Sequence, residues 1–96
     1  MAKGYWVIFA DVTDPEGYKS YMAANAKALA KFGARFLARG GVAKTYEAGL
    51  DQRTVMIEFE SVQQAIAAHD SADYQRALQA LGNGAERDIR IVESIA

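Results

Sequence analysis

The order of its strand-like and helix-like segments constrains this chain more than any other feature. Residues 5–12, 34–47, 53–60 and 86–95 are β-branched, aromatic or alternating in the way expected of strands. Residues 15–32 and 62–81 carry apolar residues at the three- and four-residue spacing of amphipathic helices. The order strand–helix–strand–strand–helix–strand is the split βαβ pattern. It predicts an α+β, ferredoxin-like domain with both helices on one face of a four-stranded antiparallel sheet.

Capping residues predict where the helices begin. The first helix starts either at a capping box of Thr13 and Glu16 or at Asp14-Pro15, which places proline at the first helical position. A second capping box at residues 61–64 begins the second helix, and Asp70-Ser71-Ala72 is expected to interrupt it. Gly40-Gly41 predicts a bulge or bend inside the second strand, because glycine otherwise weakens a strand.

Composition indicates one globular domain over residues 1–96, with 51% hydrophobic and 24% charged residues. The absence of cysteine excludes disulfides, zinc–thiolate sites and thiol nucleophiles. A net charge of −1 gives no reason to expect binding to nucleic acid or to anionic lipid. No apolar run is long enough to span a membrane, and the first residues show no secretory pattern, so we expect a cytoplasmic protein.

The sheet is expected to have one face that a single copy leaves bare. The helices should cover the face that carries Trp6, Ile8, Val55, Ile57, Phe59 and Ile91. The other face should then carry Tyr5, Val7, Phe9, Leu37, Met56 and Val92. An apolar patch of this size is unusual on a monomer, so we predict a homodimer that pairs face to face as a two-sheet barrel. A different register, or a terminus covering this face, is the alternative.

RNA-recognition domains share this topology, but the third strand does not resemble theirs. It lacks the basic and aromatic signature of those domains, and Glu58 and Glu60 would repel phosphate on the open face. We therefore expect no nucleic-acid partner.

Several short motifs resemble one known family over nearly the whole chain. They are Gly4-Tyr5-Trp6, Asp11-Val12-Thr13-Asp14-Pro15-Glu16, Ala24-Asn25-Ala26, Phe36-Leu37-Ala38-Arg39-Gly40-Gly41 and Ile57-Glu58-Phe59. They are similar to domain of unknown function 1330, within the superfamily of dimeric α/β barrels. The resemblance implies ferredoxin-like subunits that pair through their sheets. The superfamily includes cofactor-free monooxygenases and muconolactone isomerases, so it implies such an activity as one option.

Asn25 and His69 are the candidate catalytic residues. Asn25 lies within the apolar stripe of the first helix, and a buried amide without partners costs about 1–3 kcal/mol. It either holds a ligand's carbonyl or enolate oxygen or pairs with the backbone of a neighbouring strand. His69 is the only histidine, and it is either a general base or a structural residue near a helix end. Asp70 is not expected to orient it, because adjacent helical residues point apart.

The candidate ligand-binding residues are Trp6, Tyr21, Arg39, Glu58 and Tyr74. Arg39 and Glu58 are expected side by side on the open face, where they either bind and protonate a ligand or form a salt bridge that sets the dimer register. Trp6, Tyr21 and Tyr74 either line a pocket with Asn25 and His69 or pack as plain core.

Other chemistry lacks support in the sequence. No metal site and no cofactor are expected, because the ligands and the glycine-rich phosphate loops are missing. Two functions remain: binding of a small organic acid or aromatic molecule in a pocket, or catalysis by a cofactor-independent monooxygenase or isomerase. The fold alone does not choose between them.

Overall fold

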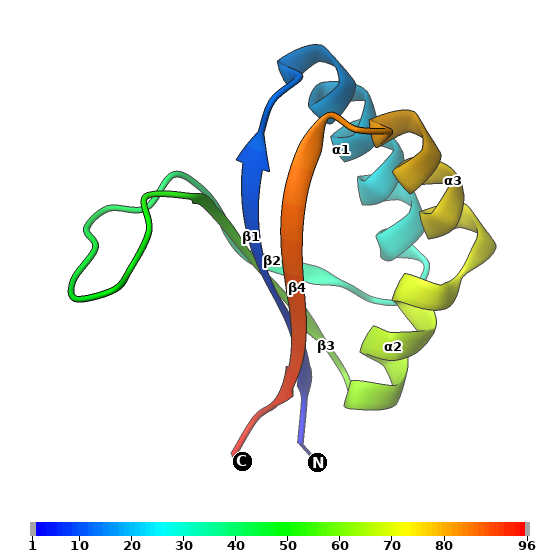
Figure 1. Cartoon of the computed structure of the whole chain (residues 1–96). Helices are drawn as coiled ribbons and strands as arrows, with labels where there is room; N and C mark the ends of the chain where they lie inside the picture. Colours follow the sequence, from blue (N-terminus) through cyan, green and yellow to red (C-terminus); the bar gives the residue numbers. More distant parts are fainter. Residues whose placement is uncertain (1, 96) are drawn as a thin grey trace.

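The computed structural model describes residues 2–95 and confirms the α+β, ferredoxin-like fold (Figure 1). Its strands form one antiparallel sheet in the order β2-β3-β1-β4, and the helices all lie on one face of that sheet. The elements are β1 (Gly4–Val12), α1 (Pro15–Ala30), β2 (Arg35–Gly40), β3 (Arg53–Phe59), α2 (Val62–Asp70), α3 (Ala72–Leu81) and β4 (Ala85–Glu93).

The core lies between the sheet and the helices, and β1 runs through its centre. Trp6 is opposite Ile57 on one neighbouring strand and Ile91 on the other, and Trp6 and Ile57 are fully buried. Ile8, Val55 and Phe59 belong to the same buried cluster, and Ile91 packs against it. The predicted inward face of the sheet is therefore confirmed.

The helix starts follow local hydrogen-bonding rules. Asp14 is the N-cap of α1 and Pro15 is its first residue, so the proline alternative is confirmed and the Thr13–Glu16 capping box is not formed. Ser61 caps α2 by accepting a hydrogen bond from the Gln64 amide at 3.1 Å. The interruption near residue 71 is also confirmed. Extended backbone at Ser71 separates the two helices, and its hydroxyl caps α3 by accepting from the Tyr74 amide at 3.2 Å.

The second strand is confirmed, but it is shorter than the predicted range of residues 34–47. The strand β2 ends at Gly40, whose φ of 144° lies where side chains are rarely tolerated. Residues 41–52 instead form a long loop that projects away from the sheet on the side opposite the helices (Figure 1). The sheet irregularity falls between Phe36 and Ala38, not at the glycine pair.

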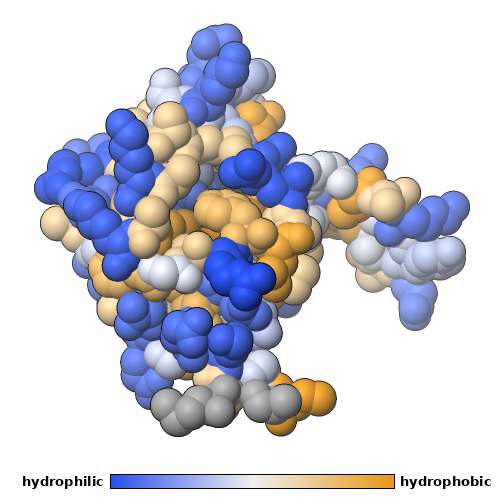
Figure 2. All heavy atoms as spheres, turned by 180° about the vertical axis from the view of Figure 1, so that it is seen from behind, coloured by the Kyte–Doolittle hydropathy of each residue, from blue (hydrophilic) through white to orange (hydrophobic). Residues whose placement is uncertain are grey.

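The face of the sheet opposite the helices carries both apolar and charged side chains. Val7 lies opposite Met56, and Tyr5 lies opposite Val92. Two ion pairs lie on the same face, Arg35 with Glu58 at 3.5 Å and Arg90 with Asp88 at 3.0 Å. Seen from behind, apolar atoms gather between the helices and the projecting loop (Figure 2). Among residues 2–95, no helix has the length and apolar character needed to cross a membrane.

Candidate functional site

A hollow of about 500 Å³ lies on the helix side of the sheet, where α2 and α3 meet β4. Four of its seven lining residues are aliphatic, but polar atoms make up more of its exposed wall than apolar atoms do. The lining residues are His69, Leu78, Leu81, Gly82, Ala85, Arg87 and Ile89. A concave apolar site with a few polar groups is the usual form of a small-molecule site.

Arg87 reaches this hollow because of its place in β4. It shares the inward face of the strand with Ile89 and Ile91, and it lies opposite Ala10 of β1. Its guanidinium lies 4.8 Å from the centre of the Tyr21 ring and donates to the Tyr74 hydroxyl at 2.7 Å. It also donates to the Tyr21 hydroxyl. Within residues 2–95, Arg87 forms no ion pair with a carboxylate.

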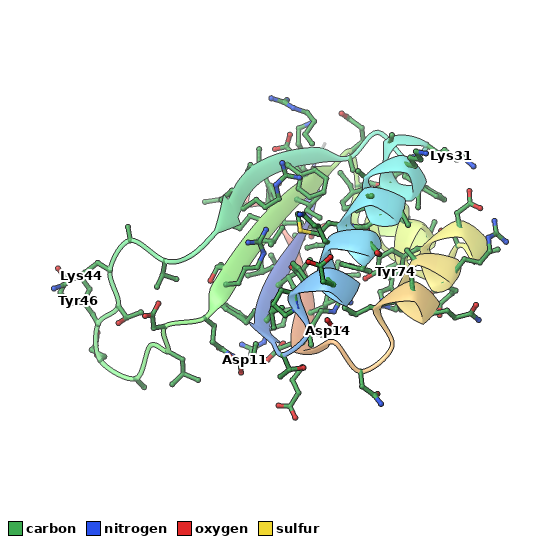
Figure 3. All side chains as sticks on the ribbon, turned by 90° about the horizontal axis from the view of Figure 1, so that it is seen from above. Asp11, Asp14, Lys31, Lys44, Tyr46 and Tyr74 are labelled. Atoms are coloured by element: carbon green, nitrogen blue, oxygen red, sulfur yellow. The ribbon has the colours of Figure 1, made fainter. Side chains whose placement is uncertain are left out.

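Tyr21 and Tyr74 bring α1 and α3 together behind Arg87. Their hydroxyl oxygens are 2.9 Å apart and share a hydrogen bond, and both side chains are buried. Tyr74 lies beside α1 when the molecule is viewed from above (Figure 3). Burial and the neighbouring Tyr74 raise the pKa of Tyr21 well above its usual range. Tyr21 therefore keeps its proton and supplies no negative charge to Arg87.

An aromatic cluster forms the inner layer of the site. Tyr74 packs edge-on against Trp6 at 5.0 Å between ring centres, and His69 lies 5.2 Å from Tyr74 and 5.9 Å from Trp6. The indole N–H of Trp6 donates to the Ala65 carbonyl at 2.9 Å, which fixes the ring under α2. Trp6, Tyr21 and Tyr74 therefore support the hollow from behind and are not among its lining residues.

His69 lines the hollow and is partly exposed there. The expectation that Asp70 would not contact it is wrong, because Nδ1 of His69 lies 3.3 Å from the Asp70 carboxylate. Asp70 is the last residue of α2, where the backbone leaves the helix. The rule that adjacent helical side chains diverge therefore does not hold at this position.

Asn25 is not part of the hollow. Its side chain is 6% exposed on the inner face of α1, and its Oδ1 atom has no hydrogen-bond partner within residues 2–95. Of the two alternatives for Asn25, pairing of that oxygen with a strand backbone is therefore wrong. The structure brings His69 together with the aromatic cluster but leaves Asn25 outside the residues that line the hollow.

The expected pairing of Arg39 with Glu58 on the open face is also wrong. The bulge in β2 shifts the register by one residue, so Arg39 lies opposite Val55 and stacks 5.0 Å from the Phe36 ring. A one-residue shift moves every later side chain to the other face of a sheet. Arg35, not Arg39, is the arginine that pairs with Glu58 on the open face. Glu58 also accepts a hydrogen bond from the Tyr5 hydroxyl at 3.1 Å.

A second hollow, of about 640 Å³, lies between the projecting loop and the open face of the sheet. Its walls include Phe9 and Arg90 from the sheet and Lys44 and Tyr46 from the loop, and these two loop residues are labelled in Figure 3. Its arginine is already paired with Asp88. In the part of the chain that the structure describes, no cluster of acidic and histidine side chains is arranged to hold a metal ion.

Arg87 is the site residue that sequence reasoning missed. The signal was present, because Arg87 is two residues before Ile89 and four before Ile91, which were placed on one face of the last strand. A charged residue in phase with buried isoleucines indicates an inward-pointing charge, and such charges are found mainly where they have a partner or a function.

Comparisons with known proteins agree with this fold. A family model described as a domain of unknown function (DUF1330) matches residues 3–95. No curated protein matches the chain. A protein of unknown function from Rhodopseudomonas palustris has a TM-score of 0.76 at 10% identity, covering 99% of this chain and 84% of that one.

Two further solved structures are similar in fold. SnoaB, a cofactor-independent oxygenase from Streptomyces nogalater, has a TM-score of 0.67 at 15% identity, covering 100% of this chain and 96% of its own. A dimeric ferredoxin-like protein of unknown function from Thermobifida fusca has a TM-score of 0.65 at 16% identity, covering 97% and 92%. At such low identity these similarities concern the fold alone.

Proposed function

The chain belongs to the family described as domain of unknown function DUF1330, and from this starting point we propose that it binds a small organic acid or aromatic molecule. The ligand occupies the hollow between α2, α3 and β4. The observation that carries this proposal is that two polar groups, those of His69 and Arg87, share one hollow with four aliphatic lining residues. The buried rings of Trp6 and Tyr74 hold the inner side of the site in place.

The same proposal includes a homodimer that forms through the open face of the sheet. Met56 and Val92 are exposed there, and half-buried Val7 lies between Met56 and Arg90 in the sheet. Covering these side chains with the same surface of a second copy removes apolar area from water. The dimeric state described for the Thermobifida fusca protein supports this choice of partner. A cytoplasmic location stays a prediction of the sequence.

Binding can be tested with 2-naphthoate as the probe and the Trp6 indole N–H as the reporter. The chain has one tryptophan, so a ¹⁵N-labelled sample gives one indole resonance, located next to His69 and Tyr74. We expect a saturable shift of this resonance. Replacing Ala85, which lines the hollow, with phenylalanine should raise Kd about tenfold or more, because overfilling a packed space costs about 1–3 kcal/mol.

Ala80→Phe is the matched control, because Ala80 is exposed on α3 and is not among the residues lining the hollow. It should leave Kd unchanged. A wild-type resonance that does not move, or equal binding by the Ala85→Phe and Ala80→Phe variants, would contradict the proposed site.

The second candidate is a cofactor-independent enzyme of monooxygenase or isomerase type. His69 favours it, because an imidazole at the wall of this hollow is placed to accept a proton from a bound substrate. Asn25 has no part in this version, since it does not line the hollow. SnoaB, described as a cofactor-independent oxygenase, has a similar fold.

Oxygen uptake with 1,4-dihydroxy-2-naphthoate tests this candidate, because that electron-rich acid shares the rings and carboxylate of the binding probe and reacts with oxygen once deprotonated. We expect His69→Gln to abolish any uptake above the protein-free rate while the melting temperature stays nearly unchanged, since His69 is partly exposed. Uptake that persists in the variant removes His69 as the base, and a large fall in melting temperature would mark it as structural.

A further inference from the structure

The hollow between α2, α3 and β4 presents hydrogen-bond donors and an uncompensated positive charge. A guanidinium has five N–H donors and no acceptor. Arg87 uses one N–H on the Tyr21 hydroxyl and one on the Tyr74 hydroxyl, which leaves about three N–H groups free. Arg87 is half-buried, and it is itself part of the wall. Free donors on a half-buried cation favour an acceptor with negative charge.

The tyrosine pair orients this cation but does not neutralise it. Both hydroxyls accept from Arg87, and they share one hydrogen bond with each other. Two hydroxyls carry two protons, and their mutual bond uses only one of them. The cluster as a whole is therefore a set of donors around one positive charge.

The carboxylates of the chain that lie nearest in sequence or structure are exposed or engaged elsewhere. Asp73 of α3 pairs with Lys31 and Arg76, and Asp88 of β4 pairs with Arg90. Asp11, Glu86 and Asp88 border a smaller hollow that Arg87 also touches, and all of them are exposed, so water screens their charges. Asp70 contacts His69 from the surface. The positive charge at the wall of the hollow is left for a ligand.

We propose that this hollow selects its ligand by a carboxylate, which Arg87 receives on its free N–H groups while the aliphatic lining residues contact the rest of the molecule. This inference rests on the proposed function and decides between its two ligand classes, in favour of an organic acid. Charge-assisted hydrogen bonds from arginine to a carboxylate are about twice as strong as neutral ones, and often involve two parallel bonds. Tyr21 and Tyr74 act as positioning residues, because they hold the plane of the guanidinium from behind.

A matched pair of probes tests the selection. 2-Naphthoate and 2-naphthamide have nearly the same shape, but only the first carries a negative charge. We expect the wild-type protein to bind the naphthoate about tenfold or more tightly than the amide, measured by the Trp6 indole shift, since hydrogen bonds to a charged group are stronger than those between neutral groups. Arg87→Met should remove this preference, mainly by weakening binding of the naphthoate.

Arg90→Met is the matched control, because Arg90 lies on the same strand but faces the opposite side of the sheet and is paired with Asp88. It should keep the full preference. Tyr21→Phe should reduce the preference while leaving the affinity for the amide unchanged, which a role in stability alone would not produce. If Arg87→Met does not fold, the wild-type comparison of the two probes decides the question.

The outcomes separate the inference from the proposed function. Equal binding of the two probes by the wild-type protein would overturn the carboxylate selection and leave the small-molecule site standing. A preference that survives Arg87→Met would overturn the role of Arg87. If neither probe moves the indole resonance, the proposed function fails and the inference fails with it.

Discussion

Replacing Trp6 with alanine is expected to lower the free energy of unfolding by about 3–5 kcal/mol, the usual cost of removing a large aromatic side chain from a core. Trp6 is fully buried at the centre of the sheet and touches three other rings, those of Phe59, His69 and Tyr74. Its loss also leaves the Ala65 carbonyl without the donor that it has at 2.9 Å. A domain of this size has about 5–15 kcal/mol of stability in total, so much of it would be lost.

Urea unfolding followed by circular dichroism measures this effect without relying on tryptophan fluorescence. Tyr46→Ala is the control, because Tyr46 is 74% exposed on the projecting loop and should change stability by less than about 0.5 kcal/mol. Protein concentration must be equal in all samples, because the proposed dimer would add to apparent stability. A loss below about 1 kcal/mol for Trp6→Ala would show that the aromatic cluster is not the centre of the core.

Replacing Met56 with glutamate is expected to separate the proposed dimer into monomers. Met56 is 36% exposed in the middle of the open face, between Val7 and Ala38 in the sheet. In a face-to-face dimer the substitution places one extra carboxylate from each copy in the interface, and an unpaired buried charge costs several kcal/mol. We expect the dimer dissociation constant to rise about 100-fold or more.

Sedimentation velocity at micromolar concentration measures the change. Ile66→Glu is the matched control, because Ile66 is 45% exposed on α2, which lies on the other face of the sheet. It adds the same charge and should leave the dimer intact. A wild-type protein that sediments as a 10.4 kDa particle, or a Met56→Glu variant that sediments as the wild type does, would rule out this arrangement.

The sequence predicted the inner face of the sheet because its period of two is regular in the central strands. Val55, Ile57 and Phe59 alternate without interruption, and the structure buries each of them. The same reasoning misplaced Arg39, because one extra residue near Leu37 reverses the alternation in β2. A bulge of this kind has no glycine to mark it, so the register of an edge strand cannot be read from spacing alone.

The residues of the candidate site were also predicted only in part. The sequence indicates four candidate site residues that the structure brings into one cluster: His69, Trp6, Tyr21 and Tyr74. Asn25 is a candidate because it lies on the apolar face of α1. The structure buries it there, but it does not line the hollow. Arg87 was overlooked, although its phase in the last strand pointed inward.

By itself the sequence determined the order of the elements, the cap of α2 and the face of β1 and β3 that is buried, because hydrogen bonding and hydrophobic periodicity act over a few residues. Only the tertiary structure decided that Arg87 meets Tyr21 and Tyr74. These residues are separated by as many as 66 positions along the chain, and their contact depends on how α1 and α3 are placed over β4. The spacing of residues along the sequence carries no information about that placement, because it is determined by the packing of the whole core.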